Sequence, residues 1–188
     1  MDGLDLATRE RLPDALRILV EKYPRAGWEG HPHFSELTRC WLDMHLGFRR
    51  MQGLLMAETE GFLDRAREPE AYARGLVRVA GQYLNGLHGH HNIEDHHYFP
   101  MLKALDARIA SGFDLLDADH QAMDGAIHEL AEATNAVLLA VRAATPAEAA
   151  AEVLRLRLGG FGRMLDRHLT DEEELVVPVI LDNPAARI

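Results

Sequence analysis

Two segments of the chain repeat one pattern of histidine, acid and proline. The first begins at His90 and reads HHNIEDHHYFPML, and the second begins at His168 and reads HLTDEEELVVPVI. Each contains His-x-x-x-Glu with a second acid directly after it, and then a proline after four more residues. Residues i and i+4 lie on one face of an α-helix, so each segment directs an imidazole and a carboxylate the same way.

One further histidine on an apolar stripe precedes each segment. His45 lies 45 residues before His90, and His120 lies 48 residues before His168. The chain therefore looks like two copies of a helix pair, each of which supplies one histidine and then one His-x-x-x-Glu.

The composition favours helices throughout. Ala, Leu, Arg, Glu and Met dominate, aromatic residues make up only 6% of the chain, and the alternation typical of strands does not recur. We expect a short helix over about residues 13–23 and a long one over about 34–67. A second long helix should begin at Pro69, with a restart or kink at Pro100. A third should follow residues 111–114, and a fourth should run from residues 145–148 to Pro178, which ends or bends it. These elements predict an all-α fold, an antiparallel up-down four-helix bundle with an extra short N-terminal helix.

The length of the chain fits a single bundle domain. Of its 188 residues 47% are hydrophobic, which is enough for a substantial core. We expect an N-terminal helix and connector over residues 1–32, the bundle over 33–180 and a C-terminal tail over 181–188.

Charge and cysteine content exclude several classes of function. The net charge is -10 and no segment concentrates Lys and Arg, which argues against nucleic acid or anionic membrane as a partner. Apolar runs fall far short of the ~20 residues of a spanning helix. The N-terminus has no signal-peptide pattern, and Cys40 is the only cysteine, so we expect a reducing, cytoplasmic setting without disulfides or cysteine-bound zinc.

An up-down bundle would bring the polar faces of the two repeats to one axis. Buried carboxylates without partners cost several kcal/mol and repel each other, and a pair of metal ions removes both penalties. Glutamates can bridge two ions while histidines supply terminal nitrogens. The candidate ligands are His45, His90, Glu94, His120, His168 and Glu172.

The sequence leaves the partition of these ligands and the metal open. One ion would take His45 with either His90 or His168, and the other would take His120 with the remaining histidine. Iron, manganese and zinc all suit mixed histidine and carboxylate ligands. Zinc normally has four ligands in a closed structural site, so two bridging acids favour dinuclear iron or manganese.

At this point a family resemblance is apparent. His45, HHNIED with the following FP, DHQAM around His120, and HLTDEEELVVP resemble the hemerythrin-like, or HHE cation-binding, family over about residues 33–180. The resemblance implies a four-helix bundle that holds two iron ions in a non-haem di-iron centre. By position it implies the six ligands above, with Glu94 and Glu172 as the bridging carboxylates.

Two departures distinguish the chain from the oxygen-carrying members. They have a second histidine where this chain has Asp124, and they end with His-x-x-x-x-Asp where this chain has His168-x-x-x-Glu172. Reversible oxygen transport is therefore in doubt. Asp124 is a further candidate ligand, or a supporting or merely polar residue. His91 is another, because some relatives use a residue at this position as an extra ligand.

Several neighbours of the candidate ligands are open to two interpretations. Asp43, Asp95 and Asp119 would either orient imidazoles through the second ring nitrogen or face away. Glu173 and Glu174 would lie in solvent or beside the ligands. Tyr83 and Phe161, each seven residues before a ligand, would pack over the site, and the sharper alternative is that Tyr83 offers its hydroxyl to a bound molecule.

Three hypotheses for function follow. The first is binding or sensing of dioxygen or nitric oxide, with any signal passing through a partner or an oligomer interface such as that of a homodimer. The second is a di-iron enzyme that consumes peroxide, oxygen or nitric oxide, or a protein for iron storage or donation. The third is a structural bundle without functional metal, in which the histidine-rich stretch is only polar surface.

Overall fold

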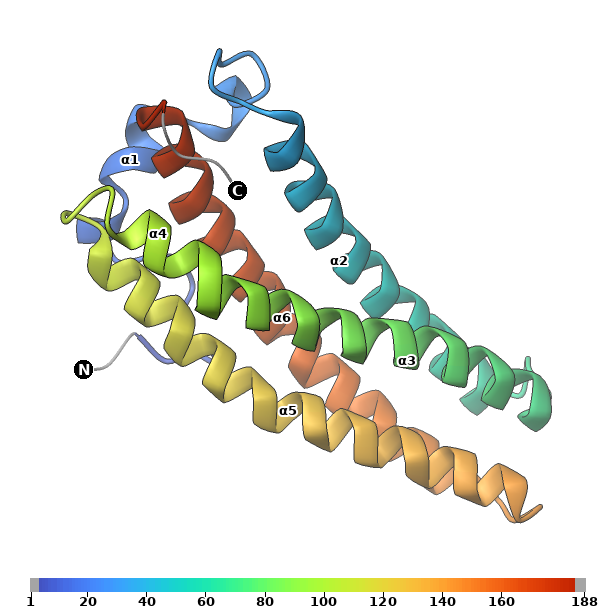
Figure 1. Cartoon of the computed structure of the whole chain (residues 1–188). Helices are drawn as coiled ribbons and strands as arrows, with labels where there is room; N and C mark the ends of the chain where they lie inside the picture. Colours follow the sequence, from blue (N-terminus) through green and yellow to red (C-terminus); the bar gives the residue numbers. More distant parts are fainter. Residues whose placement is uncertain (1–3, 185–188) are drawn as a thin grey trace. The chain divides into compact units, whose positions relative to one another are not determined.

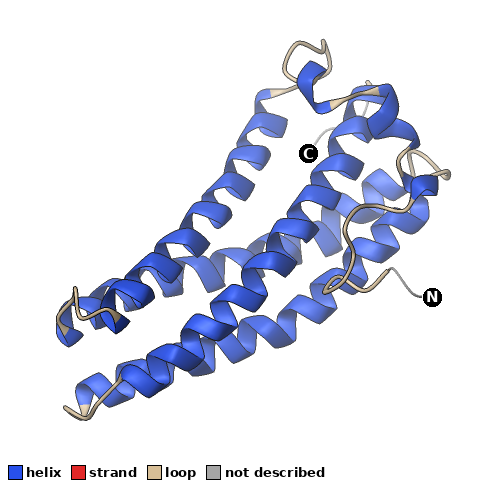
Figure 2. Ribbon diagram, turned by 180° about the vertical axis from the view of Figure 1, so that it is seen from behind, coloured by secondary structure: helices blue, strands red, loops and turns tan. Residues whose placement is uncertain are grey.

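The computed structural model describes residues 4–184, and all regular structure within them is helical (Figures 1 and 2). The all-α prediction is therefore confirmed. The long helices are α2 (Glu36–Leu63), α3 (Pro69–Ile93), α5 (Ala110–Arg142) and α6 (Glu148–Asp182). The shorter elements are η1 (Asp14–Leu16), α1 (Ile18–Lys22), η2 (Arg25–Gly27), the π-helix η3 (Glu94–Tyr98) and α4 (Phe99–Lys103).

The long helices contribute to two compact units. Unit 1 contains the chain up to Leu46, residues 90–122 and the chain from Asp166, whereas unit 2 contains residues 47–89 and 123–165. All the histidines and glutamates predicted as ligands lie in unit 1. Asp124 alone among the candidates lies in unit 2.

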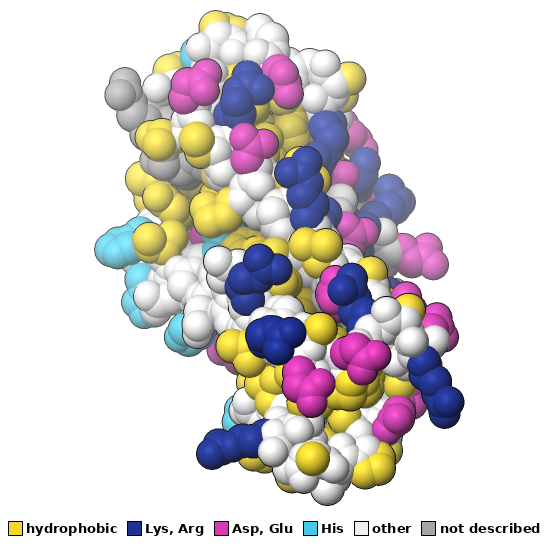
Figure 3. Space-filling view, turned by 90° about the vertical axis from the view of Figure 1, so that its right-hand side faces the viewer, with side chains coloured by type: hydrophobic (Ala, Val, Ile, Leu, Met, Phe, Trp, Pro, Cys, Tyr) yellow, Lys and Arg dark blue, Asp and Glu magenta, His cyan; other side chains and the backbone are white. Residues whose placement is uncertain are grey.

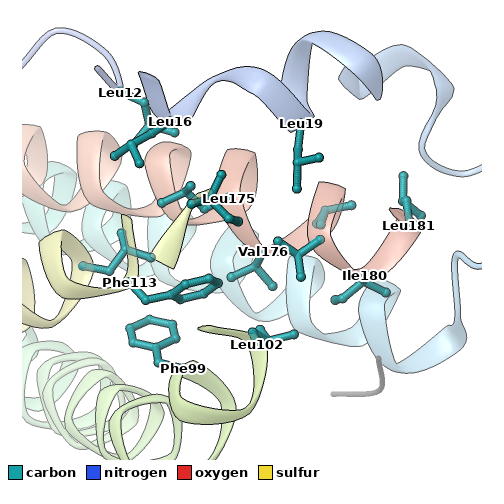
Figure 4. Packing of buried hydrophobic residues seen from close by; sticks show 14 of the residues in the cluster. Leu12, Leu16, Leu19, Phe99, Leu102, Phe113, Leu175, Val176, Ile180 and Leu181 are labelled. Atoms are coloured by element: carbon teal, nitrogen blue, oxygen red, sulfur yellow. The ribbon is translucent and has the colours of Figure 1, made fainter. Parts of the chain in front are cut away.

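The apolar core of unit 1 fixes the N-terminal segment. Leu12, Leu16 and Leu19 point from it toward α6, where they meet a cluster that includes Leu175 and Val176 (Figure 4). All five of these side chains are buried. Burial of a leucine contributes roughly 1.5–3 kcal/mol, so these contacts attach the segment firmly to the helices of unit 1.

One glycine permits this close packing. A Cβ atom at Gly112 of α5 would lie 2.9 Å from both δ-methyl carbons of Leu175 and 3.5 Å from a δ carbon of Leu16. Carbon atoms do not approach to 2.9 Å without displacement, whereas 3.5 Å is an ordinary contact. The absence of a side chain at Gly112 therefore lets α5 lie close to Leu175 of α6.

Unit 2 contains a chain of polar contacts beside its apolar core. Tyr83 donates its hydroxyl hydrogen to Oε1 of Gln52 (2.9 Å), and Gln52 donates to the carbonyl of Leu158 (2.6 Å). Burial raises the pKa of Tyr83 far above its ordinary range. The Tyr83 hydroxyl thus links helices of unit 2, and its ring lies edge-on to Phe161 with centroids 6.1 Å apart.

The π-helix η3 shifts the register of the chain between α3 and α4. An uninterrupted α-helix would put positions three, four and seven after Glu94 on the buried face. His97 and Met101 are instead exposed, whereas Phe99 and Leu102 are buried. The wide turn accommodates one extra residue, so that the apolar residues after Glu94 reach the core one position later.

Pro178 does not end the last helix. Helix α6 continues past it to Asp182. Proline has no N–H, so the carbonyl of Glu174 loses its helical hydrogen bond, which costs about 3 kcal/mol in a helix interior. Val177, Val179 and Ile180 around the proline are all buried, and this packing offsets the loss. Of the two outcomes predicted for Pro178, an end or a bend of the helix, the end was wrong because tertiary packing outweighed local preference.

The surface shows mixed charge and one thiol. Acidic and basic side chains are interspersed on the face seen in Figure 3. Cys40 is exposed. None of the described helices combines the length and apolar character needed to span a bilayer.

Candidate metal centre

Two pairs of imidazoles face each other inside unit 1. Nε2 of His45 on α2 lies 2.9 Å from Nε2 of His90 on α3. Nε2 of His120 on α5 lies 3.0 Å from Nε2 of His168 on α6. Of the two pairings that the sequence left open, the structure has His45 with His90.

Each glutamate lies against one histidine of each pair. Glu94 has one oxygen 3.1 Å from Nε2 of His90 and the other 3.9 Å from Nε2 of His120. One oxygen of Glu172 lies 3.5 Å from Nε2 of both His45 and His168. Both carboxylates therefore stand between the two pairs, in the arrangement that a bridging ligand requires.

The potential ligand atoms form two groups, each within 4.8 Å. One group contains His45, His90, Glu94 and Glu172, and the other contains His91, His120 and His168. The His91 ring stacks on that of His120, with centroids 4.0 Å apart and planes 12° apart. The structure thus brings His91 to the site. It does not bring Asp124 there, because that side chain is exposed and belongs to neither group.

The site is almost closed to solvent. Its five histidines and two glutamates are at most 4% exposed. Within residues 4–184, neither oxygen of Glu172 has a hydrogen-bond partner. Glu94 accepts a hydrogen bond from these residues at only one of its two oxygens. Buried carboxylates without hydrogen bonds are costly unless a cation compensates them, so these oxygens fit a metal-binding role.

Burial shifts the pKa values of the site toward neutral forms. It lowers the pKa of His90 to about 2, with repulsion from His45 and other imidazoles adding to the effect, and it lowers the pKa of His168 well below its ordinary range. It raises the pKa of Glu94 to about 7 and, together with the charge of Glu94, raises the pKa of Glu172. Neutral imidazole is the form that binds metal, and a bound cation would favour the ionised carboxylates.

Three of the histidines also meet a carboxylate through Nδ1, the nitrogen that points away from the site. The pairs are His45 with Glu173 (3.1 Å), His120 with Asp95 (2.6 Å) and His168 with Asp119 (3.5 Å). A carboxylate at Nδ1 keeps the proton there, so that the lone pair at Nε2 faces the site. Asp43, the remaining candidate for this role, is exposed.

Sequence reasoning missed the polar role of Trp41. Its indole N–H donates to Oε1 of Glu94 (2.8 Å), and the centroid of its ring lies 4.1 Å from that of the His45 ring. The signal was present, because Trp41 precedes His45 by one helical turn and carries an N–H donor on an otherwise apolar stripe.

The fold and the site together define an all-helical protein with a buried histidine and carboxylate centre suited to metal ions. The family model of the hemerythrin HHE cation binding domain matches residues 36–180, and the chain belongs to this family. The resemblance seen in the sequence is thereby confirmed, and the family implies metal binding. Searches of curated proteins and of solved structures give no match.

Proposed function

We propose that this chain holds two iron ions in one non-haem centre that binds or senses dioxygen or nitric oxide. The observation that carries the proposal is the position of Glu94 and Glu172, each against one histidine of each pair. In this proposal His45 and His90 would hold one ion, His91, His120 and His168 would hold the other, and Glu94 and Glu172 would serve as the shared carboxylates.

The chemistry of the donors supports iron. Five imidazoles and two carboxylates suit iron, with manganese and zinc as the alternatives, and no thiolate takes part. When bound, a pair of ferrous ions supplies the electrons and the open coordination positions that dioxygen or nitric oxide requires. If both glutamates are shared, the ion at His45 and His90 would have four protein ligands and the ion at His91, His120 and His168 would have five, so we expect the small molecule to bind at the first.

The residues around the ligands would hold the site rigid and dry. Glu173, Asp95 and Asp119 fix three of the rings through Nδ1. Trp41 packs on His45, and the ring of Phe99 stacks on that of His120 with centroids 5.3 Å apart. These aromatic walls limit the entry of water and would slow the loss of a reactive bound species.

The proposal includes the finer architecture expected from the sequence. Family membership supports an antiparallel up-down bundle of α2, α3, α5 and α6, with α1 as the additional N-terminal helix. A signal from the centre would then pass through a partner, and a second copy of the chain is the simplest one.

Metal analysis tests the proposal directly. Protein purified without chelator or nickel resin is analysed for metal, reconstituted anaerobically with ferrous iron, and followed by absorption during reduction and exposure to air. We expect two irons per chain and charge-transfer bands that bleach and return. One zinc, or no metal after reconstitution, would contradict the proposal, and steady-state consumption of peroxide, oxygen or nitric oxide would indicate an enzyme.

A matched pair of variants on α5 shows whether the metal occupies this site. His120→Ala removes a proposed ligand, and we expect it to lose iron. His128→Ala removes an exposed histidine two turns further along the same helix and should keep both ions. Equal iron content in the two variants would place the metal elsewhere.

A further inference from the structure

Two arginines from outside the matched domain reach the carboxylates that hold the site's histidines. Both belong to the N-terminal segment, residues 4–35, which precedes the family match at residues 36–180. Arg9 pairs with Asp119 and Arg25 pairs with Glu173. The structure therefore contains two rows of arginine, carboxylate and histidine, and each row ends at a different pair of imidazoles.

The first row is buried. The guanidinium of Arg9 donates to both oxygens of Asp119, and its Nε donates to Asp171 (2.8 Å). One of the Asp119 oxygens lies 3.5 Å from Nδ1 of His168. The side chains of Arg9, Asp119 and Asp171 are at most 3% exposed. Buried charges of this kind must be paired, so the position of Asp119 depends on Arg9.

The second row starts nearer the surface. Arg25 donates to one oxygen of Glu173, and the other oxygen lies 3.1 Å from Nδ1 of His45. The side chain of Arg25 is 53% exposed, whereas that of Glu173 is 3% exposed. The guanidinium also lies over the ring of Trp28, 4.6 Å from its centroid. The buried carboxylate is thus oriented by an arginine that the solvent can reach.

The remaining carboxylate and histidine pair provides an internal comparison. Asp95 lies 2.6 Å from Nδ1 of His120, and its side chain is 27% exposed. In the part of the chain that the structure describes, no arginine approaches Asp95. Arginine therefore accompanies one histidine of each pair and not every histidine of the site.

Apolar contacts hold the two arginines in place. Leu12, Leu16 and Leu19 lie between them in the sequence and are buried against α6 (Figure 4). The segment is thus attached along its length, and its two charged ends are directed at the carboxylates.

We propose that the N-terminal segment is a working part of the metal centre, in which Arg9 and Arg25 are positioning residues for His168 and His45. Each arginine orients a carboxylate and draws charge from it, so that the carboxylate accepts the Nδ1 proton less strongly and the imidazole is a weaker donor to the metal. A weaker donor and a nearby positive charge both favour the reduced ions. This inference rests on the proposed metal centre.

Three variants of one segment test the inference. Arg9→Gln and Arg25→Gln remove the two positioning charges. Arg17→Gln is the matched control, because Arg17 belongs to the same segment and pairs with Glu174 (3.1 Å), the residue after Glu173. The variants of the full chain are titrated anaerobically with Co²⁺, whose visible bands report its coordination. Midpoint potentials are measured after loading with iron.

We expect Arg9→Gln and Arg25→Gln to weaken Co²⁺ binding about tenfold, the lower end for loss of such outer partners, because the lost orientation of His168 and His45 outweighs their stronger donation to the metal. Both should change the Co²⁺ bands and lower the midpoint potential, and Arg17→Gln should do neither. Arg25→Lys keeps the charge and should restore most of the potential. A merely structural role would alter stability without moving the potential.

The outcomes separate this inference from the proposed function. If the wild type binds metal and both variants match Arg17→Gln in affinity and potential, the inference is overturned while the metal centre stands. If the wild type binds no metal, both are overturned. Circular dichroism establishes whether each variant folds. If the buried Arg9→Gln fails to fold, the exposed Arg25 still decides the result.

Discussion

Trp41 donates its indole N–H to the oxygen of Glu94 that also lies 3.1 Å from Nε2 of His90. Both side chains are buried, so the hydrogen bond is not exchanged for one with water. The indole thus fixes the rotation of a carboxylate that we propose as a bridge. The other oxygen of Glu94 forms no hydrogen bond with the described residues and stays available to a metal ion.

Trp41→Phe tests the value of this bond. Phenylalanine keeps an aromatic ring beside His45 and removes the donor, so we expect the unfolding free energy of the metal-free protein to fall by about 1–3 kcal/mol. Urea denaturation measures this change. We also expect weaker metal binding, because the carboxylate loses its fixed orientation.

Tyr72→Phe is the control for this variant. Tyr72 is also buried and also donates a hydrogen bond, to Oγ1 of Thr59 (2.9 Å). It should lose similar stability and bind metal as the wild type does. If the two variants bind metal equally well, the indole does not position Glu94 for the metal.

Glu172→Gln should separate stability from metal binding. Neither oxygen of Glu172 accepts a hydrogen bond within residues 4–184, and its pKa is raised by burial and by Glu94. Loss of this carboxyl should leave the metal-free protein as stable as the wild type or more stable. The metal content, measured after reconstitution, should fall from two ions to at most one.

Glu174→Gln is the matched substitution two residues away. Glu174 is partly exposed and pairs with Arg17, so its loss should lower the unfolding free energy by less than about 1 kcal/mol. The variant should still bind both metal ions. A Glu172→Gln protein that is much less stable than Glu174→Gln when metal-free would show that the carboxylate is needed for folding itself.

The stability of the metal-free protein should depend on pH through Glu94. Its pKa is raised from 4.5 to about 7, so the stability due to its protonated form is complete below pH 4.5 and is lost as the pH rises to 7. His90 acts in the opposite sense, because its lowered pKa removes stability as the pH falls below 6.5. Between pH 4.5 and pH 6.5 the effects of Glu94 and His90 on stability therefore have opposite signs.

Glu94→Gln removes this carboxylate. With chelator present, the unfolding free energy of the wild type relative to the variant should decrease from pH 4.5 to 7, by at most about 1.4 kcal/mol per pH unit. Urea denaturation at several pH values measures it. A difference that stays constant across this range would mean that Glu94 titrates normally.

His91 and Asp124 should differ in their effect on metal binding. His91 belongs to the group with His120 and His168, whereas Asp124 is exposed. We expect His91→Leu to weaken binding of one ion and Asp124→Ala to leave both affinities unchanged, as measured by anaerobic titration. Loss of metal in the Asp124 variant alone would reverse this assignment.

The repeat in the sequence predicted which side chains gather, because the spacing of His90 and Glu94 fixes their common face in any helix. It did not predict which histidines pair. Periodicity gives the face of each helix but not the direction in which successive helices turn around the axis. The contact between His45 and His90 therefore required the structure.

The contacts of Arg9 with Asp119 and of Arg25 with Glu173 could not be predicted from the sequence either. Arg9 and Arg25 lie in short or irregular elements, where no period relates position to direction. The contact of Glu173 with His45 was not predictable for a related reason. Glu173 adjoins Glu172 in sequence but reaches His45 on another helix, and nothing in a run of three glutamates distinguishes the buried Glu172 and Glu173 from the partly exposed Glu174.

The π-helix η3 has a consequence for protein engineering. A designer who transfers His-x-x-x-Glu to a straight α-helical scaffold would copy the correct spacing of His90 and Glu94. Without the wide turn, however, the residues that follow would be rotated by about 100°, and Phe99 would leave His120. The segment to be transferred is thus the His-x-x-x-Glu turn together with the change of register that follows it. A design should therefore include the whole π-helix, Glu94–Tyr98.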